Sequence, residues 1–330
     1  MKIFLTHPQE ALRNYYGDRA LAGLREVGEV RLNPRGRELD ASELIEAARG
    51  CELVVSYRGT PGFAELFDAS PDLVAFSRCA IDIRNVDVAA ASRNGILVTQ
   101  ASAGFIQSVS EWVIGAMVDL GRNITAATED YHAGRVPSPR MGAQLDGATV
   151  GIIGYGQIAR RLAPLCLALR MRVLVSDPHA HVEDPEISRV GFEELLAESD
   201  FVVCLAIANA ATENLMSRAA FARLKRGAYF VNASRGNLVD EVALREALDR
   251  GQLAGCAMDV GRAPDQMPTP ELARHPKVIA TPHVAGLTPQ AIEHQSLETV
   301  AQAAEIAQGR PPRGSVNADK ATRLARLAPG

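Results

Sequence analysis

A glycine-rich hexapeptide between two apolar runs carries the clearest chemistry in this sequence. The run at residues 150–153 leads into Gly154-Tyr155-Gly156-Gln157-Ile158-Ala159, and a second run at 173–175 is followed by Asp177, 23 positions after Gly154. The order is strand, tight turn, helix, strand and acid, which is the context in which such a hexapeptide binds a dinucleotide. We therefore predict a dinucleotide site at this turn.

Individual positions of this segment meet the demands of that ligand. Gly154 permits the tight turn, Gly156 lets the backbone approach a pyrophosphate, and the small Ala159 lets helix and strand pack closely. Unpaired N–H groups at the start of the helix suit phosphates. Asp177 can accept hydrogen bonds from ribose hydroxyls and would repel a 2′-phosphate. Because no Arg or Lys follows Asp177 directly, the sequence favours NAD over NADP.

Size and composition limit the class of protein. A chain of 330 residues exceeds the usual size of one core, so we expect two domains. A net charge of −4 argues against a surface for nucleic acid or an anionic membrane. No apolar run is long enough to span a membrane, and the first ten residues are too polar for a signal peptide. Five scattered cysteines and no paired histidine ligands predict buried reduced thiols, a cytoplasmic protein and no metal.

Apolar strands alternate with helices along the whole chain, which predicts βαβ units and parallel sheets. The expected strands are Lys2–Leu5, Leu53–Ser56, Val74–Phe76, Ile96–Val98, Phe201–Ala206, Ala228–Asn232, Gly255–Asp259 and Val278–Ala280. The expected helices include Ala41–Ala48, Val86–Arg93, Ser108–Gly121, Ser217–Lys225 and Asp240–Arg250, and another begins after Thr288-Pro289.

The fingerprint lies in the second group of strands, and the first hundred residues have none. The fold class is therefore α/β with two doubly wound parallel sheets, a Rossmann NAD-binding domain (102–286) inserted into a flavodoxin-like substrate domain (1–101 and 287–330). We expect the tail after Gly309 to lie loosely on the surface. Ligands are expected at the carboxyl ends of the strands.

Two further segments place reactive side chains just after expected strands of the nucleotide domain. Arg235 follows the strand that ends at Asn232, and a planar guanidinium there can grip a carboxylate with two parallel hydrogen bonds. His283 follows the strand that ends at Ala280, in a turn bounded by Pro and Gly. Imidazole titrates near neutral pH, so His283 suits proton exchange with a hydroxyl or carbonyl oxygen. The alternatives are a surface arginine that caps a helix or pairs with Asp240, and a structural histidine.

With these segments in order, the chain resembles the D-isomer-specific 2-hydroxyacid dehydrogenases, the family that includes phosphoglycerate, glyoxylate/hydroxypyruvate and D-lactate dehydrogenases. The matching stretches are Asn85-Val86-Asp87, Asn94–Val98, Ser110-Glu111, Gly151–Ala159, Glu194–Asp200, Asn232–Glu241, Ala257–Val260 and Thr281-Pro282-His283. The resemblance implies hydride transfer between a nicotinamide and carbon 2 of a small D-2-hydroxy acid or 2-oxo acid. It also implies a homodimer formed through the 108–121 helix region.

The resemblance assigns roles to matching residues. Arg235 would hold the carboxylate of the 2-oxo acid and polarise its carbonyl, and His283 would exchange the proton. Asp259 would orient the nicotinamide carboxamide, and the backbone around Ala80 and Ile81 would hold the substrate carboxylate. The implied cofactor-binding set is Gly154, Tyr155, Gly156, Gln157, Ile158, Asp177, Ala206, Ala233, Asp259, His283 and Gly286.

The acid that pairs with the histidine in the family is displaced in this chain. Position for position, Pro264 stands where the family has Glu, and one inserted residue brings Asp265 into that place. An Asp there could still raise the pKa of His283 and fix its tautomer. Asp265 is therefore the predicted catalytic acid partner, with Glu271 or no acid as the alternatives.

The substrate loop also departs from the usual glycine-rich form and reads Arg78-Cys79-Ala80-Ile81-Asp82. The side chains of this loop are bulkier than glycine and narrow the space through which a substrate approaches the loop. Arg78 and Arg58 are candidates for binding a phosphate or second carboxylate on the substrate, the alternative being that both are ordinary surface arginines.

Two other functions stay open at this point. The first is an NAD(H)-sensing, corepressor-like binding protein on the same fold, favoured by the unusual acid region and the altered substrate loop. The second is an oxidoreductase for a different acid, such as formate or phosphite. The formate enzymes place Gln at the acid position, and Gln266 is available there.

Overall fold

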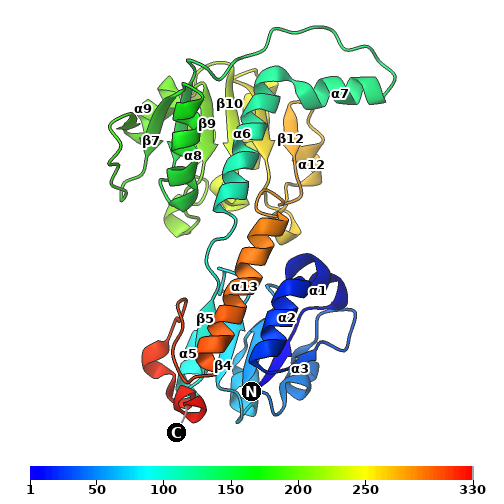
Figure 1. Cartoon of the computed structure of the whole chain (residues 1–330). Coiled ribbons are helices and arrows are strands. Elements are labelled where there is room, and N and C mark those ends of the chain that lie inside the picture. The colour runs from blue at the N-terminus through cyan, green and yellow to red at the C-terminus, as the bar shows by residue number, and fades with distance from the viewer. Residues whose placement is uncertain (329–330) are drawn as a thin grey trace. The chain divides into compact units, whose positions relative to one another are not determined.

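The structure is a computed structural model that describes residues 1–328, with only the backbone described for Asp265. The described chain divides into two compact units (Figure 1). The small unit comprises Met1–Gly104 and the chain from Pro289 onward, and the large unit is Phe105–Thr288. The boundaries predicted after residues 101 and 286 lie within three residues of these.

The small unit is built on a parallel sheet in the order β2-β1-β3-β4-β5. Its strands are β1 (Lys2–Leu5), β2 (Glu29–Leu32), β3 (Leu53–Ser56), β4 (Ala75–Arg78) and β5 (Leu97–Gln100). Its α-helices are α1 (Gln9–Tyr15), α2 (Asp18–Val27), α3 (Ala41–Ala48), α4 (Ala64–Ala69), α5 (Val88–Arg93) and α13 (Pro289–Ile306).

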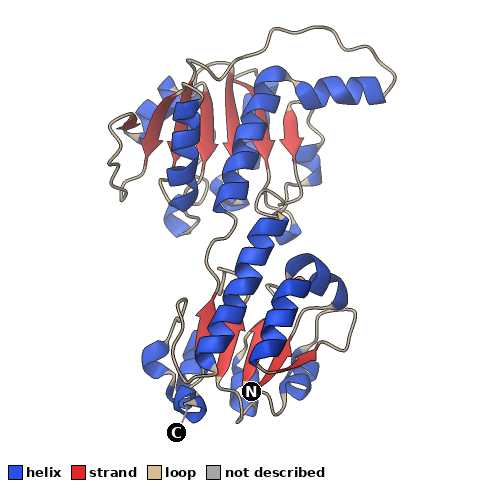
Figure 2. Cartoon of the chain, in the orientation of Figure 1, coloured by secondary structure: helices blue, strands red, loops and turns tan. Residues whose placement is uncertain are grey.

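Helices cover both faces of this sheet, so its central strands bury both of their faces (Figure 2). One hydrophobic cluster joins Ile3 and Leu5 to Leu24 of α2 and Ile306 of α13. A second cluster on the other face contains side chains from α3, α4 and α5. Burial on both faces explains why β3 and β4 are continuous apolar runs rather than alternating ones.

The expectation that the tail lies loosely on the surface is wrong. The backbone N–H of Val316 donates to Val98 O at 2.9 Å, and that of Gln100 donates to Gly314 O at 2.9 Å, so the tail pairs with β5. Farther along, Ala321 and Leu324 enter the core beside Leu97. The small unit is therefore completed by the last part of the chain.

The large unit carries the second parallel sheet, in the order β12-β11-β10-β9-β6-β7-β8. Its strands are β6 (Thr149–Ile153), β7 (Arg172–Ser176), β8 (Ile187–Arg189), β9 (Phe201–Cys204), β10 (Ala228–Asn232), β11 (Leu253–Met258) and β12 (Val278–Ala280). Its α-helices are α6 (Ile106–Arg122), α7 (Ile124–His132), α8 (Gln157–Ala168), α9 (Phe192–Glu198), α10 (Arg218–Arg223), α11 (Glu241–Asp249) and α12 (Pro270–Ala273).

Two hydrophobic clusters again pack on opposite faces of this sheet. Leu120 of α6 and Leu162 of α8 share one cluster with Val150, and Leu244 of α11 shares the other with Phe230. None of the helices in the described chain is both long and apolar enough to cross a membrane. Within the same residues, no group of three or more His, Cys, Asp or Glu is arranged to hold a metal ion.

Candidate functional site

The glycine-rich turn lies at the topological switch point of the large sheet. From β6 the chain proceeds to β7 and β8 on one side and then returns to β9 on the other. Gly154, directly after β6, has φ +88°, and a Cβ on it would lie 2.6 Å from Ala206 Cα, just beyond β9. Both the backbone conformation and this contact require glycine, so the turn can bring the chain close to a ligand in the crevice.

The next residues form an open helix start. Gly156 is the N-cap of α8, no side chain in the described structure caps this helix, and nothing lies within 4 Å of a Cβ built on Gly156. The N–H groups of the first turn, which begins with Gln157 and Ile158, therefore face space in which phosphate oxygens fit.

Asp177 completes this half of the site. One carboxylate oxygen accepts the N–H of Tyr155 at 2.8 Å, and the other accepts those of His179 and Ala180 at 2.8 and 3.1 Å. Burial would raise the pKa of Asp177, but these N–H groups outweigh it and hold the pKa below its usual range. The carboxylate is thus charged and fixed beside the glycine turn, where ribose hydroxyls can donate to it. The turn, the open helix start and the fixed acid together fit a dinucleotide without a 2′-phosphate.

The carboxyl ends of β10, β11 and β12 are connected by backbone hydrogen bonds. Asp259 N–H donates to Asn232 O at 3.2 Å, and His283 N–H donates to Asp259 O at 3.0 Å. Arg235 lies in the loop after β10, where its carbonyl accepts a hydrogen bond from the side-chain amide of Asn232 at 3.0 Å. The structure therefore brings the backbones of Arg235 and His283 to the same edge of one sheet, with β11 between the strands that they follow. Ala233 lies at this edge too, with its N–H 3.4 Å from Cys204 O.

The His283 loop is held by the buried carboxylate of Asp259, which is 2 % exposed. One oxygen accepts the Thr281 hydroxyl at 2.6 Å and the Val284 N–H at 2.8 Å. The other oxygen accepts the Ala285 N–H at 2.9 Å. His283 itself has φ +56°, a left-handed conformation that is costly for a residue with a Cβ and that persists only when its surroundings fix it. Strained residues held in this way cluster at functional sites.

Gly286, which ends this loop, is packed tightly against α6. A Cβ on Gly286 would lie 3.0 Å from the Phe105 Cβ. A larger residue would push the loop away from the helix, so the position of the His283 turn depends on this glycine.

The acid region forms a short 3₁₀ turn, Pro264–Gln266, after β11. The side chain of Asp265 lies outside the described part of the structure, so its pairing with His283 stays a prediction. Gln266 has φ +58°, and its side-chain oxygen is buried without a partner among the described residues. Glu271 instead pairs with Arg245 at 2.5 Å in an exposed ion pair, which speaks against it as the acid partner.

In the small unit, the Ala80-Ile81 backbone is available for an anion. Within the described chain, no hydrogen-bond acceptor is present for the N–H groups of Ala80 and Ile81, although Ala80 O accepts Ala101 N–H at 3.1 Å. Unpaired neighbouring N–H groups of this kind can receive a carboxylate.

Arg78 has a different role from the predicted one. Its side chain is buried, and its guanidinium donates to the carbonyl oxygens of Tyr57, Thr60, Arg58 and Asp82 and to the Asn85 side chain. All five of its N–H groups are therefore taken by protein acceptors. In this structure Arg78 clamps the loop after β3 to the loop after β4 and presents no donor to a ligand.

Arg58, by contrast, is exposed, and it lies directly after β3 at the carboxyl edge of the small sheet. Its guanidinium carbon lies 5.4 Å from the centre of the Tyr15 ring. Sequence reasoning missed Tyr15, and it also missed His7, which comes just after β1. A titratable residue directly after an expected strand was the signal available for His7.

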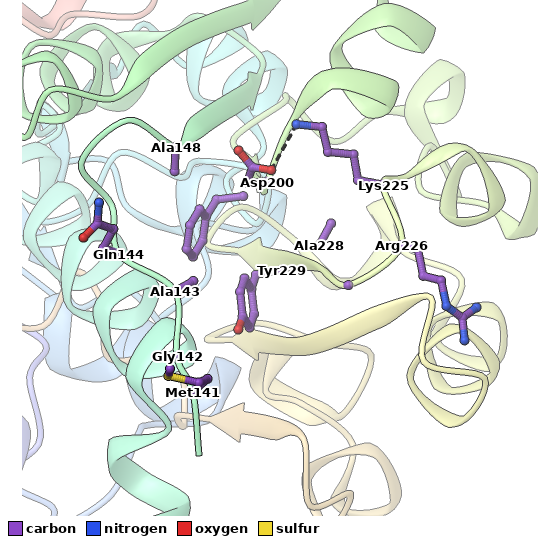
Figure 3. A pocket seen from close by; sticks show the side chains of 12 residues that line it. Met141, Gly142, Ala143, Gln144, Ala148, Asp200, Lys225, Arg226, Ala228 and Tyr229 are labelled. Atoms are coloured by element: carbon purple, nitrogen blue, oxygen red, sulfur yellow. Dashed lines mark hydrogen bonds and ion pairs between the residues drawn. The ribbon is translucent and has the colours of Figure 1, made fainter. Parts of the chain in front are cut away.

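A hollow of about 400 Å³ lies elsewhere in the large unit, at the amino ends of β6, β9 and β10 (Figure 3). Asp200 pairs there with Lys225 at 3.0 Å, and the Phe201 and Tyr229 rings stack with their centres 5.0 Å apart. Because Gly154 follows the carboxyl end of β6, this hollow lies at the opposite edge of the sheet from the dinucleotide turn.

Comparisons with known proteins agree with this geometry. The model of the D-isomer specific 2-hydroxyacid dehydrogenase NAD-binding domain matches residues 114–285. The chain belongs to the D-isomer specific 2-hydroxyacid dehydrogenase family. Residues 114–285 thus form its NAD-binding domain. The family resemblance seen in the sequence is confirmed. The expected pair of parallel α/β domains is confirmed as well.

Individual relatives cover different shares of their own length. A D-3-phosphoglycerate dehydrogenase of Archaeoglobus fulgidus is 32% identical over 283 residues, which are 84% of this chain and 54% of that protein. A hydroxypyruvate reductase of Thermotoga maritima is 29% identical over 82% of this chain and 89% of its own. The chain thus spans about half the length of the phosphoglycerate dehydrogenases it matches. The fold of a D-lactate dehydrogenase from Lactobacillus jensenii, solved with NAD⁺, superposes with a TM-score of 0.83 at 23% identity, covering 96% of this chain and all of that one.

Proposed function

We propose that this chain is an NAD-dependent oxidoreductase that interconverts a small D-2-hydroxy acid and its 2-oxo acid. The observation that carries the proposal is the shared sheet edge, where Arg235 and His283 lie in the loops after β10 and β12, on either side of β11, and Asp259 fixes the strained His283 turn. A nicotinamide supplies the hydride or accepts it when bound. The residues of the chain must then bind the acid, polarise its carbonyl and move one proton.

Each of these tasks has a candidate group. The N–H groups of Ala80 and Ile81 bind the substrate carboxylate, and Arg235 holds the carboxylate and carbonyl oxygens. In reduction His283 donates a proton to the oxygen that forms on carbon 2, and in oxidation it removes that proton. Asp265 is the proposed partner of His283, because its charged carboxylate would orient the imidazole ring. The Asp259 carboxylate already accepts three hydrogen bonds from the His283 loop, so it contributes at least the position of that loop.

The test is NADH oxidation with glyoxylate, hydroxypyruvate, phosphohydroxypyruvate and 2-oxoglutarate, in the parent protein and in matched variants. His283→Ala is expected to lower kcat by about 10²–10⁴-fold. His275→Ala is the control and is expected to leave kcat unchanged. His275 is in the same unit and pairs with Asp249, but it lies outside the loops that form the proposed site. Arg235→Ala is expected to raise KM strongly, whereas Arg245→Ala, which breaks an exposed pair, is expected to leave it unchanged.

Unchanged turnover in His283→Ala would remove this residue as the proton donor. Tight NADH binding with no turnover of any of the four acids would instead favour the NAD(H)-sensing binding protein.

We further propose a homodimer in the cytoplasm. Several exposed apolar side chains lie along α6, α7 and the segment that follows, and they support a contact surface there: Val118, Ile124, Tyr131, Val136 and Met141. Sedimentation at micromolar concentration tests the dimer, with Tyr131→Asp expected to shift it toward monomer. Five free and buried thiols agree with a reducing compartment.

A further inference from the structure

The short 3₁₀ turn after β11 lies in a loop that contacts the loop carrying Arg235. We call residues 261–269 the acid loop and residues 233–240, after β10, the Arg235 loop. The backbone N–H of Gly261 donates to Gln266 O at 2.8 Å and closes the acid loop over its turn. A Cβ on Gly236 would overlap the Gly261 carbonyl group, so the two loops meet backbone to backbone. The position of the acid turn therefore depends on how these two loops are held together.

The carboxylate of Glu241 binds both ends of the acid loop. One oxygen accepts the backbone N–H of Arg262 at 3.1 Å, and the other accepts the Thr269 hydroxyl at 2.8 Å. Glu241 is the first residue of α11, directly after the Arg235 loop, and the side chain of Asp240 caps this helix. One carboxylate, placed by the start of a capped helix, thus fixes the acid loop at its two ends.

The side chain of Arg262 connects the acid loop to two neighbouring segments. Its Nε donates to Val239 O at 3.1 Å, and its Nη2 donates to Asn237 O at 3.0 Å, so both nitrogens reach the Arg235 loop. Nη2 also lies 2.9 Å from Glu213 Oε1 and 2.6 Å from Asn214 Oδ1, in the segment between β9 and α10. A planar guanidinium reaches acceptors in several directions at once, whereas an ammonium group is a single point of charge.

The acceptors around Arg262 are themselves held in place. The second oxygen of Glu213 accepts the Asn237 side-chain amide at 2.9 Å, and the Asn214 N–H donates to Asn237 O at 2.9 Å. Hydrogen bonds from Asn237 and Arg262 hold the pKa of Glu213 below its usual range, so both members of the Arg262–Glu213 pair are charged near pH 7. Arg262 therefore meets an ordered set of acceptors rather than flexible surface groups.

The Arg235 loop has further ties that do not involve Arg262. Ser234 Oγ donates to Ala206 O at 2.6 Å, and the Met216 N–H donates to Leu238 O at 2.9 Å. Removal of the Arg262 side chain should therefore free the acid loop and leave the Arg235 loop in place.

We propose that Arg262 is a positioning residue that holds the acid turn against the Arg235 loop at the carboxyl edge of the large sheet. This rests on the proposed function, in which Asp265 of that turn is the partner of His283. Arg262 touches no substrate in this role. It keeps the acid turn at one place while the reaction proceeds. Because the Arg235 loop has its own ties, the effect appears in kcat, and KM for the 2-oxo acid stays unchanged.

The experiment compares Arg262→Met, which removes every donor, with Arg262→Lys, which keeps a charge opposite Glu213. We expect Arg262→Met to lower kcat about tenfold, because a displacement of about 1 Å at a reacting group costs on the order of 100-fold. KM for the preferred 2-oxo acid should stay within about twofold of the parent value, and the Lys variant should recover part of kcat. Arg223→Met is the matched control: it breaks an exposed pair with Glu193, at 3.1 Å in the same unit, and should change neither constant. An unchanged kcat in Arg262→Met, or a loss confined to KM, would overturn the proposal.

A double-mutant cycle with Asp265→Asn separates positioning from general damage. Asp265→Asn alone removes the charge that the proposed function assigns to the acid turn. If Arg262 acts by placing that carboxylate, Arg262→Met should lower kcat by less than about twofold more in the Asp265→Asn background. A further loss of about tenfold in that background would overturn the proposal, and so would an Asp265→Asn variant with the turnover of the parent protein.

Amide hydrogen exchange in the protein with bound NADH makes the test independent of turnover. The N–H groups of Gly261 and Ala263, which close the acid loop, should exchange about tenfold faster in Arg262→Met, and the Met216 N–H should keep its parent rate. If the acid loop loosens in this way but even the parent protein turns over none of the acids, the proposed function alone is refuted. Unchanged exchange at Gly261 and Ala263 would refute the role of Arg262.

Discussion

Replacing Asp259 with Asn tests the idea that one buried carboxylate holds the His283 loop. Asn is nearly the same size, but it exchanges one acceptor oxygen for an NH₂ group. If the Asn oxygen keeps the hydrogen bonds from Thr281 and Val284, the NH₂ group faces the Ala285 N–H, and two donors then meet without an acceptor. A lost hydrogen bond to a charged group is worth about 1.5–3 kcal/mol, and a buried N–H is left unpaired. We expect the free energy of unfolding to fall by about 3 kcal/mol.

The same change should act on catalysis. His283 adopts φ +56°, and with one tether gone the turn can relax toward ordinary backbone conformations. A displacement of about 1 Å at a reacting group costs on the order of 100-fold in rate, so we expect kcat to fall by about 10- to 100-fold.

Urea unfolding and steady-state kinetics of Asp259→Asn measure the two effects, and Thr281→Val is the matched control. The valine variant removes one hydroxyl donor but leaves both backbone N–H bonds, so its cost should stay near 1 kcal/mol. The reasoning is refuted if Asp259→Asn unfolds like the parent protein, or if Thr281→Val costs as much as Asp259→Asn.

Three further predictions concern the glycine turn, the buried arginine and the buried histidine. Gly154→Ala should weaken NADH binding more than tenfold in a fluorescence titration, because the added Cβ would lie 2.6 Å from the Ala206 backbone. Gly147→Ala is the control: Gly147 has φ +77° but nothing within 4 Å of an added Cβ, so this change should strain the backbone without weakening NADH binding. Arg78→Met should lower the free energy of unfolding in urea by about 3–5 kcal/mol, since it leaves buried carbonyl oxygens without a donor. The exposed Arg84→Met should lower it by under about 1 kcal/mol. The pKa of His7 falls from 6.5 to about 3 on folding, so as the pH drops through this window the unfolded state gains a proton that the folded state lacks. Stability should then fall by up to about 1.4 kcal/mol per pH unit, and His7→Leu should flatten the profile measured at pH 7, 5.5 and 4.

The interior strands and the edge strands β5 and β12 could be predicted from the sequence, whereas the edge strands β2 and β8 could not. Leu53–Ser56 and Ala228–Asn232 form where expected because a strand buried on both faces must be apolar throughout. In contrast, β2 and β8 lie at the edges of their sheets and expose alternate or most residues, so their sequences resemble loops. The docking of the tail depends on a few apolar residues such as Leu324, which give no periodic pattern.

The candidate site divides in the same way. The nucleotide half could be predicted because the glycine turn imposes residue types at fixed spacing. The role of Arg78 could not, because a guanidinium that binds a substrate and one that binds backbone carbonyls have the same sequence signature. The acceptors that distinguish the two cases come from loops up to 21 residues away in the chain.

The docked tail also bears on the order in which the chain can fold during synthesis. The large unit is one continuous stretch and has all its strands once residue 288 has left the ribosome. The small unit contains β1, which is made before every other described strand, yet α13, Ala321 and Leu324 supply part of the core over β1. Its early strands must therefore remain incompletely covered while more than two hundred later residues are translated. That interval is when the nascent small unit is most exposed to aggregation and to chaperone binding.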